Sequence, residues 1–305
     1  MDELLQSKGY EVENTIGEGT YSKVKRAYCN TRGRHVAIKI IDTRKGPKVR
    51  TVLKLIMAMQ IDFWFCSSYC FAGTTAVRVT KLLSDFISRF LPRELQIAQK
   101  LDHKNIIKVY EVYKSEDGKI GLVMELAERG DLFEHISKGG PLSERQAKDL
   151  FGQLAESVRH CHENGVTHRD LKCENTLLDK NFSLKLADFG FAKLVPPNSE
   201  ELSTTFCGST AYAAPEVLKG SPHDSRKSDT WSMGVVLYVM LSGHLPFDDT
   251  NIPKMLSQQE KGISLDHLSN HSPDCKDLLL TMLTYNIQQR PFIGGICSHK
   301  WLEAD

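Results

Sequence analysis

The spacing of apolar and polar residues changes character along the chain. In the first third it has the two-residue period of β-strands, interrupted by turns rich in Gly and Asn. The predicted strands cover residues 10–16, 22–29, 35–41, 106–113 and 120–126. A helix is predicted over 93–101, and the turn signal Glu116-Asp117-Gly118 separates the last two strands. We therefore expect an antiparallel sheet in this part.

From about Gly130 the apolar residues recur with the helical period. Ser143 followed by Gln146 forms a capping box, and the helix that it opens ends at Asn164-Gly165. Further helices are predicted over 229–242 and from Pro273, with Ser272 as N-cap. The fold class is thus α+β, with a small β-rich part, a hinge near 125–130 and a larger helical part.

The amino-acid composition limits the class of protein and the cellular compartment that we expect. The 305 residues include 41% hydrophobic and 25% charged residues, as in ordinary soluble proteins. The net charge of +1 provides no overall attraction to nucleic acid, so we expect no nucleic-acid partner. The 8 cysteines form no C-x-x-C pair, and the polar N-terminus is unlike a signal peptide. We expect reduced thiols and a cytoplasmic location.

Two features of the predicted sheet suit phosphate binding. Gly17-Glu18-Gly19 lies between two strands, where backbone amides of a Gly-rich hairpin cover phosphates, although Ser22 replaces the third glycine of G-x-G-x-x-G. An ordinary hairpin turn is the alternative. Lys39 ends the apolar run Val36-Ala37-Ile38, and a buried ammonium needs an anionic partner. A phosphate together with a helix carboxylate would supply one.

The strongest chemical signal is the run His168-Arg-Asp-Leu-Lys-Cys-Glu-Asn175, followed by Asp188-Phe-Gly190. It provides Asp170 to orient a hydroxyl and accept its proton, and Lys172 to neutralise phosphate charge. Asn175 and Asp188 provide the hard oxygen ligands that magnesium prefers. Ala214-Pro-Glu216 follows as the end of an activation loop would. A charged surface turn does not account for this combination.

The order and spacing of these motifs resemble the eukaryotic protein kinases from about Tyr10 to Trp301. Residues 201–218, 231–241 and 245–256 look like the testis-specific serine/threonine kinases, within the calmodulin-kinase-like group, and 90–111 is most similar to a small member of that family. The resemblance implies a bilobal protein kinase domain over 10–302, with a small lobe over 10–125 and a large lobe over 126–302. It also implies ATP and Mg²⁺ as cofactors, phosphorylation of protein Ser/Thr residues, and a role in sperm development.

The resemblance also assigns roles by position. Asp170 is the catalytic base, Lys172 contacts the γ-phosphate and favours Ser/Thr substrates, and Asn175 and Asp188 are the magnesium ligands. Lys39 pairs with the phosphates and with Glu94. Met124 is the gatekeeper, and Glu125 to Ala127 form the adenine-binding hinge. The nucleotide-binding set is Ile16, Gly17, Gly19, Val24, Ala37, Lys39, Glu94, Met124, Glu125, Ala127 and Asp131.

Substrate-binding roles follow in the same way. Asp131 and Glu174 match carboxylates that pair with an upstream Arg, so we expect protein substrates with basic residues before the phosphosite. Two solvated surface carboxylates are the alternative. Ser209 braces Lys172 and Asp170. Structural roles are expected for Asp229 and for a buried pair between Glu216 and Arg290.

Arg169 before the catalytic Asp suggests activation by phosphorylation, because a loop phosphate pairs with that guanidinium. Thr205 is the expected acceptor, with Thr204 and Ser203 as alternates, and an upstream kinase is the expected partner. An unmodified polar loop remains the alternative. Cys173 invites a redox interpretation, but a small buried filler is the simpler one.

The chain departs from the family between Lys39 and Glu94. It runs there for 55 residues, whereas the kinase pattern needs on the order of 15 to 20. The flanks place an extra segment at 48–83, either a retained intron or a natural loop. A membrane helix over 55–72 is disfavoured by the central Asp62. We expect a monomeric enzyme; the alternative is a catalytically impaired isoform that acts as a binding protein because the insert displaces the helix bearing Glu94.

Overall fold

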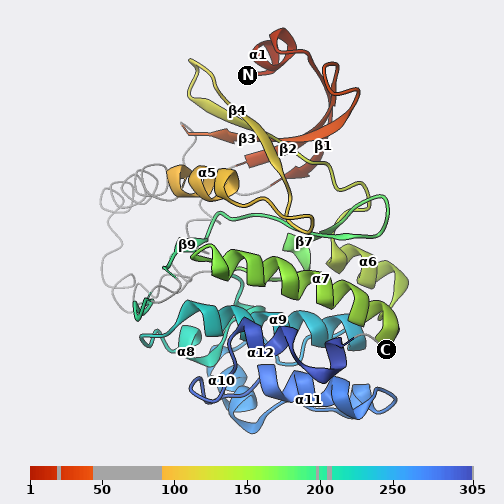
Figure 1. The fold of residues 1–305 in the computed structure, drawn as a ribbon, viewed down its shortest axis with the longest axis vertical. Helices are drawn as coiled ribbons and strands as arrows, with labels where there is room; N and C mark the ends of the chain where they lie inside the picture. Colours follow the sequence, from red (N-terminus) through yellow and green to blue (C-terminus); the bar gives the residue numbers. More distant parts are fainter. Residues whose placement is uncertain (19–21, 44–90, 197–198, 205–207, 304–305) are drawn as a thin grey trace. The chain divides into compact units, whose positions relative to one another are not determined.

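The computed structural model describes residues 1–18, 22–43, 91–196, 199–204 and 208–303 (Figure 1). The chain forms two compact units, Met1–Asp102 with Ile107–Glu128 and His103–Ile106 with Arg129–Asp305. Gly19, Thr205 and the expected insert at 48–83, which contains the membrane-helix alternative, lie outside the described residues. None of the described helices is long and apolar enough to cross a membrane.

The first unit contains a five-stranded sheet in which every neighbouring pair is antiparallel, as predicted. Its strands, in the spatial order β1-β2-β3-β5-β4, are β1 (Tyr10–Glu18), β2 (Ser22–Cys29), β3 (Arg34–Asp42), β4 (Val109–Lys114) and β5 (Lys119–Met124). Helix α5 (Leu91–Lys100) packs Leu95 against the buried sheet residues Ile41 and Leu122. The short helix α1 (Asp2–Ser7) was not predicted, and its Leu5 is fully buried against the sheet.

Two predicted strand boundaries are wrong. The strand predicted over 106–113 begins only at Val109, because Ile106 belongs to the second unit and makes an isolated parallel bridge with Leu186 there. The strand predicted to reach 126 ends at Met124, and the Glu125 amide donates to the Lys108 carbonyl at 2.9 Å. Apolar spacing alone does not distinguish a ladder residue from one that bridges to another strand.

The second unit is mainly helical, as predicted. Its helices are α6 (Leu132–Gly139), α7 (Glu144–Glu163), α8 (Pro215–Leu218), α9 (Ser225–Ser242), α10 (Ile252–Lys261), α11 (Pro273–Met282) and α12 (Ile293–Cys297), with 3₁₀ turns η2 (Cys173–Asn175), η3 (Thr210–Tyr212), η4 (Asp266–Leu268) and η5 (Lys300–Leu302). The predicted capping box of α7 and the Ser272 cap of α11 are both formed.

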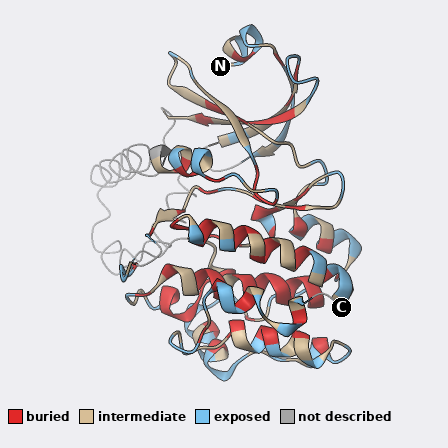
Figure 2. Cartoon of the chain, in the orientation of Figure 1, coloured by how far each residue is buried: buried red, intermediate tan, exposed pale blue. Residues whose placement is uncertain are grey.

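Helix α9 forms the centre of the second unit, since 15 of its 18 residues are buried (Figure 2). It begins four residues before the predicted start at 229, because Asp224 caps it and the polar residues of its first turn are largely buried. The expected Glu216–Arg290 pair joins α8 to the loop before α12 by hydrogen bonds of 2.6 and 3.1 Å. Arg290 is 1% exposed, and these buried charges are satisfied by one another, by nearby backbone carbonyls and by the Ser228 hydroxyl, which donates to Glu216 Oε1 at 3.0 Å.

Four short strands carry the candidate catalytic loops. Strand β6 (Val166–Thr167) pairs with β9 (Lys193–Leu194), and β7 (Thr176–Leu178) pairs with β8 (Leu184–Leu186), both antiparallel. The motif 168–175 connects β6 to β7, and the motif 188–190 connects β8 to β9. Pairing of the flanking strands therefore brings these two motifs together.

Candidate active site

The backbone of the 168–175 turn is held by one carboxylate of α9. Asp229 accepts hydrogen bonds from the amides of His168 (2.9 Å) and Arg169 (2.8 Å), and from His162 Nε2 (2.9 Å). Burial alone would raise the pKa of Asp229, but the hydrogen bond from His162 and the neighbouring donors lower it below its ordinary value. The ionised carboxylate therefore fixes the turn, in which Arg169 has a positive φ of 65°.

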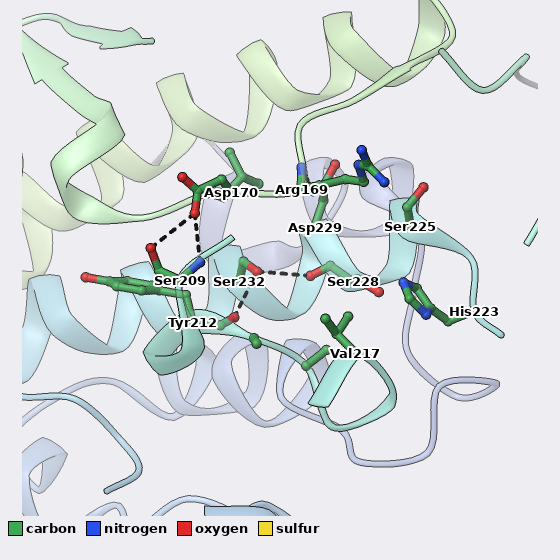
Figure 3. Close-up of a pocket in the computed structure, with 13 residues that line it drawn as sticks. Arg169, Asp170, Ser209, Tyr212, Val217, His223, Ser225, Ser228, Asp229 and Ser232 are labelled. Atoms are coloured by element: carbon green, nitrogen blue, oxygen red, sulfur yellow. Dashed lines mark hydrogen bonds between the residues drawn. The ribbon is translucent and has the colours of Figure 1, made fainter. Parts of the chain in front are cut away.

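Asp170 is the centre of a polar network and is only 7% exposed. Its Oδ1 accepts from the amide (2.9 Å) and Oγ (3.2 Å) of Ser209 (Figure 3). Its Oδ2 accepts from Asn175 Nδ2 (3.0 Å). Lys172 Nζ lies 3.3 Å from Oδ2 and donates to Ser209 Oγ at 2.8 Å. Both carboxylate oxygens are thus held in fixed directions, as a base that must orient a hydroxyl requires.

Asn175 and Asp188 are joined through the residue before Asp188. The Asn175 carbonyl accepts from the Ala187 amide at 2.9 Å, and His168 Nε2 donates to the Ala187 carbonyl at 3.1 Å. Asp188 has a positive φ of 61°, and its Oδ1 accepts from the Gly190 amide at 3.4 Å. The amide nitrogen of Asn175 is occupied by Asp170, which leaves its side-chain oxygen as the available ligand.

This donor set suits magnesium. Mg²⁺ is commonly held by one or two protein oxygens, with phosphates and waters completing its octahedron. The part of the chain that the structure describes contains no cluster of three His, Cys, Asp or Glu side chains that could enclose a metal on their own. An amide oxygen and a carboxylate beside a buried base therefore fit a metal that arrives with phosphate oxygens.

Gly208 is a functional position that the sequence prediction missed. Its φ is +94°, and a Cβ there would lie 2.6 Å from the Arg169 carbonyl oxygen and 3.1 Å from Asp170 Oδ1. Only glycine allows the backbone before Ser209 to approach the catalytic turn this closely. A lone glycine in a polar loop gives no sequence signal of such an approach.

The first unit brings together several of the residues that were predicted to bind the nucleotide. Lys39 Nζ of β3 lies 2.7 Å from Glu94 Oε1 of α5, and both side chains are largely buried. In the sheet register Val24 lies opposite Lys39, and Ala37 lies opposite Met124. Because directly paired residues and alternate residues of one strand share a face, these four side chains lie on one face of the sheet.

The other predicted nucleotide-binding residues are placed as follows. Gly17 pairs with Val24 across β1 and β2, and Ile16 is 46% exposed. Glu125 and Ala127 follow the end of β5 in the first unit. Asp131 belongs to the second unit, where its side chain caps α6 by accepting from the Glu134 amide at 2.8 Å.

Asp131 and Glu174, the two carboxylates expected to bind substrate, are carried by elements that pack together, α6 and η2. Burial raises the pKa of the Cys173 thiol between them to about 12, and the charges of Glu174 and Asp131 add to the effect. The thiol is fully buried and remains protonated at neutral pH. Cys173 therefore has the properties of a packed filler, not of a reactive cysteine.

The described part of the expected activation loop is attached to the second unit. The Ser203 and His223 backbones exchange hydrogen bonds of 2.7 and 3.0 Å, and Lys193 pairs with Glu201 at 2.7 Å. Ser203 is 3% exposed, whereas Thr204 is exposed. The Arg169 guanidinium donates through Nε to the Phe191 carbonyl at 2.8 Å.

Comparisons with known proteins identify the family of the chain. Residues 75–302 match the family model of the protein kinase domain. The chain is 54% identical over 304 residues to testis-specific serine/threonine-protein kinase 3 of Homo sapiens, and the match covers 100% of both chains. It is 42% identical to testis-specific serine/threonine-protein kinase 2 of Mus musculus, with 98% of this chain and 75% of that protein covered. The similarity expected from the motifs is confirmed.

Proposed function

The chain belongs to the protein kinase family and is a protein serine/threonine kinase, and from that premise we propose how its residues act. Asp170 orients the substrate hydroxyl and accepts its proton while the γ-phosphoryl group of ATP is transferred. The observation that carries this proposal is the geometry of Asp170, whose two oxygens are fixed by Ser209 and Asn175. A carboxylate held in this way acts by positioning, which is the main source of rate in phosphoryl transfer.

The neighbouring residues of the second unit would handle phosphate charge. Lys172, held at Ser209 Oγ, neutralises charge that develops on the transferred group. Asn175 and Asp188 would hold Mg²⁺, which supplies charge neutralisation and alignment of the phosphates when bound. Ser209 touches both Lys172 and Asp170 and so keeps the base and the cation in one arrangement.

The sheet face of the first unit would bind the nucleotide. Lys39 pairs with its α- and β-phosphates, and Glu94 fixes the ammonium in direction. Apolar Val24 and Ala37, on the same face, offer contact to the adenine ring, and the backbone of Glu125 and Ala127 offers hydrogen bonds to its edge. Gly17, Gly19 and Ile16 complete this proposed set, with Met124 at the end of β5 and Asp131 toward the ribose.

We propose that substrates carry basic residues before the phosphorylated Ser or Thr. Glu174 is exposed and Asp131 is half-buried, and both lie near Cys173 beside the catalytic turn. Two carboxylates at this place attract a guanidinium. Replacing Glu174 by Gln should raise KM for an Arg-containing peptide and leave KM for ATP unchanged. If the variant and the parent have the same KM for this peptide, Glu174 is not part of the substrate site.

We propose activation by an upstream kinase at Thr205, whose phosphate would pair with Arg169. Of the two alternates, exposed Thr204 is more accessible than buried Ser203. We expect a cytoplasmic, monomeric enzyme that is active in male germ cells. The names of the testis-specific relatives support the tissue only.

The alternative, a catalytically impaired isoform, finds no support in the described residues, because the Lys39–Glu94 pair is formed at 2.7 Å. A version lacking 48–83 tests it directly. Our proposal predicts similar phosphate transfer per mole with and without this segment. Transfer by the shortened protein alone would establish the impaired isoform.

The proposed function is tested by phosphate transfer from Mg·ATP to a basic Ser peptide. Asp170→Asn should lower kcat by about 10³-fold, because the base contributes at that level. Asp149→Asn, which changes an exposed carboxylate of α7, is the control and should behave as the parent. A parent chain that binds nucleotide but transfers no phosphate, or an Asp170→Asn variant as fast as the parent, would contradict the proposal.

A further inference from the structure

The turn that presents Ser209 to Asp170 is held from behind by a buried amide. Gln259 of α10 is fully buried, and its Nε2 donates to the Ala213 carbonyl at 3.0 Å. Its other polar atom, Oε1, is buried with no hydrogen-bond partner among the described residues. An unsatisfied buried oxygen costs free energy, so this amide has a role that an apolar side chain would not fulfil.

A second donor holds the same turn one residue earlier. Ser232 Oγ of α9 donates to the Tyr212 carbonyl at 2.9 Å (Figure 3). Within the turn, the Tyr212 amide donates to the Ser209 carbonyl at 3.1 Å, and the Ala213 amide donates to the Thr210 carbonyl at 3.0 Å. A continuous path of hydrogen bonds thus runs from α9 and α10 through η3 to Ser209 and on to Asp170.

Packing alone does not hold this turn against the catalytic loop. A cavity of about 30 Å³ lies there, lined by Asp170, Ser209, Tyr212, Ala213 and Ser232 among others (Figure 3). A void on this side removes the van der Waals contacts that would otherwise set the position of the turn. The hydrogen bonds that reach the turn from Ser232, which itself lines the cavity, and from Gln259 therefore help to decide where Ser209 lies.

From these contacts we infer that Gln259 and Ser232 are positioning residues for phosphoryl transfer: together they hold the 209–213 turn so that Ser209 fixes Asp170 and Lys172. The inference rests on the proposed function of Asp170 as the base. Neither residue touches the reacting atoms, and each acts through a backbone carbonyl of the turn.

The chain offers a matched control for Gln259. Gln258, its neighbour on α10, uses Oε1 to accept from the Asp248 amide at 2.9 Å, so this amide is directed to a different loop. Gln259→Met and Gln258→Met therefore make the same chemical change on the same helix. Met has similar length and no donor, so only the first variant releases the Ala213 carbonyl.

The test is steady-state phosphorylation of a Ser peptide by the full chain, with kcat expressed per nucleotide-binding site. We expect Gln259→Met to lower kcat about tenfold with little change in KM for ATP. Gln258→Met should match the parent. Ser232→Ala should reproduce the loss, which keeps the inference testable if Gln259→Met folds poorly. A merely structural role would reduce the number of binding sites and leave kcat per site unchanged, and that result would overturn the inference.

Amide hydrogen exchange separates this inference from the proposed function. The Tyr212 and Ala213 amides should exchange faster in Gln259→Met and Ser232→Ala than in Gln258→Met, whether or not the parent transfers phosphate. Unchanged exchange in both variants would overturn the inference. If the parent is active and both variants keep the parental kcat, the inference is also overturned, but Asp170 remains the proposed base. If the parent itself is inactive, the proposed function is contradicted.

Discussion

The two units hold their key charged residues in different ways. In the second unit Asp170 is fixed by Ser209 and Asn175, and its turn is fixed by Asp229. In the first unit Lys39 Nζ pairs with Glu94 Oε1 at 2.7 Å, so this carboxylate partner is carried by helix α5. Asp170 is held by several contacts from different parts of the second unit, whereas the Lys39–Glu94 pair depends on where helix α5 lies. Loss of one contact should therefore disturb Asp170 less than a shift of α5 disturbs the Lys39–Glu94 pair.

In the first unit the largest loss of activity should come from breaking the Lys39–Glu94 pair. Lys39→Met should lower kcat/KM for peptide phosphorylation by about 10²- to 10³-fold, the usual effect of removing one electrostatic contact to the transition state. The sheet should remain folded because Lys39 is not part of its apolar core. Circular dichroism checks the fold, and a Lys39→Met protein as active as the parent would remove Lys39 from the site.

A slightly smaller loss of activity should follow from Gly208→Ala, which places a methyl group against the turn that carries Asp170. In Gly208→Ala the new methyl group meets the Arg169 carbonyl oxygen, so Ser209 must move. A displacement of about 1 Å costs on the order of 100-fold in kcat. Gly262→Ala is the matched control, since its φ of +88° is similar but its surroundings are open. If both variants lose activity equally, backbone strain and not the close approach is responsible.

Asp229→Asn removes the carboxylate that holds the 168–175 turn. It should lower the free energy of unfolding and make that free energy depend less on pH. Because the pKa of Asp229 lies below its ordinary value, the ionised group stabilises the fold above the pKa of an unfolded Asp, about 3.9. That contribution is lost as pH falls through the lower folded pKa. Asp229→Asn should cost roughly 1–3 kcal/mol at neutral pH.

Urea unfolding of parent and Asp229→Asn between pH 3 and pH 7 measures this directly. The difference between the two proteins should shrink toward the acid end of the range. A constant difference would mean that the charge of Asp229 does not contribute.

The smallest effect is expected at Cys173, a residue of the 168–175 turn that does no chemistry. With its pKa raised to about 12, the Cys173 thiol should resist alkylation at pH 8 while the protein is folded and react once it is unfolded. Cys173→Ser should leave KM for ATP unchanged. Rapid labelling of Cys173 in the native protein, read by mass spectrometry, would revive the redox interpretation.

The sequence predicted the elements that have strong local signals. Ser143 with Gln146 and Ser272 with Pro273 located two helix starts, because a cap is encoded within four residues. The start of α9 was missed because its first turn is polar, and its burial depends on surrounding elements. Helix α1 was missed because one buried residue, Leu5, gives no periodic pattern.

The same distinction applies to the site. Asp170, Asn175 and Asp188 could be predicted because contiguous motifs encode them, and the structure places their loops side by side. Gly208, Ser232 and Gln259 were not found, because each matters only through a contact with a distant residue. Single residues in ordinary polar surroundings give no signal of such contacts.

Nucleotide binding measured separately from turnover tests the central claim most directly, namely that Asp170 performs chemistry while Asp188 holds the metal. Isothermal titration of Mg·ATP into Asp170→Asn should give the parental affinity although the variant transfers phosphate about 10³-fold more slowly. Asp188→Asn should bind Mg·ATP more weakly than the parent. If Asp170→Asn loses binding, or Asp188→Asn keeps full affinity for Mg·ATP, the division of roles between these two carboxylates is wrong.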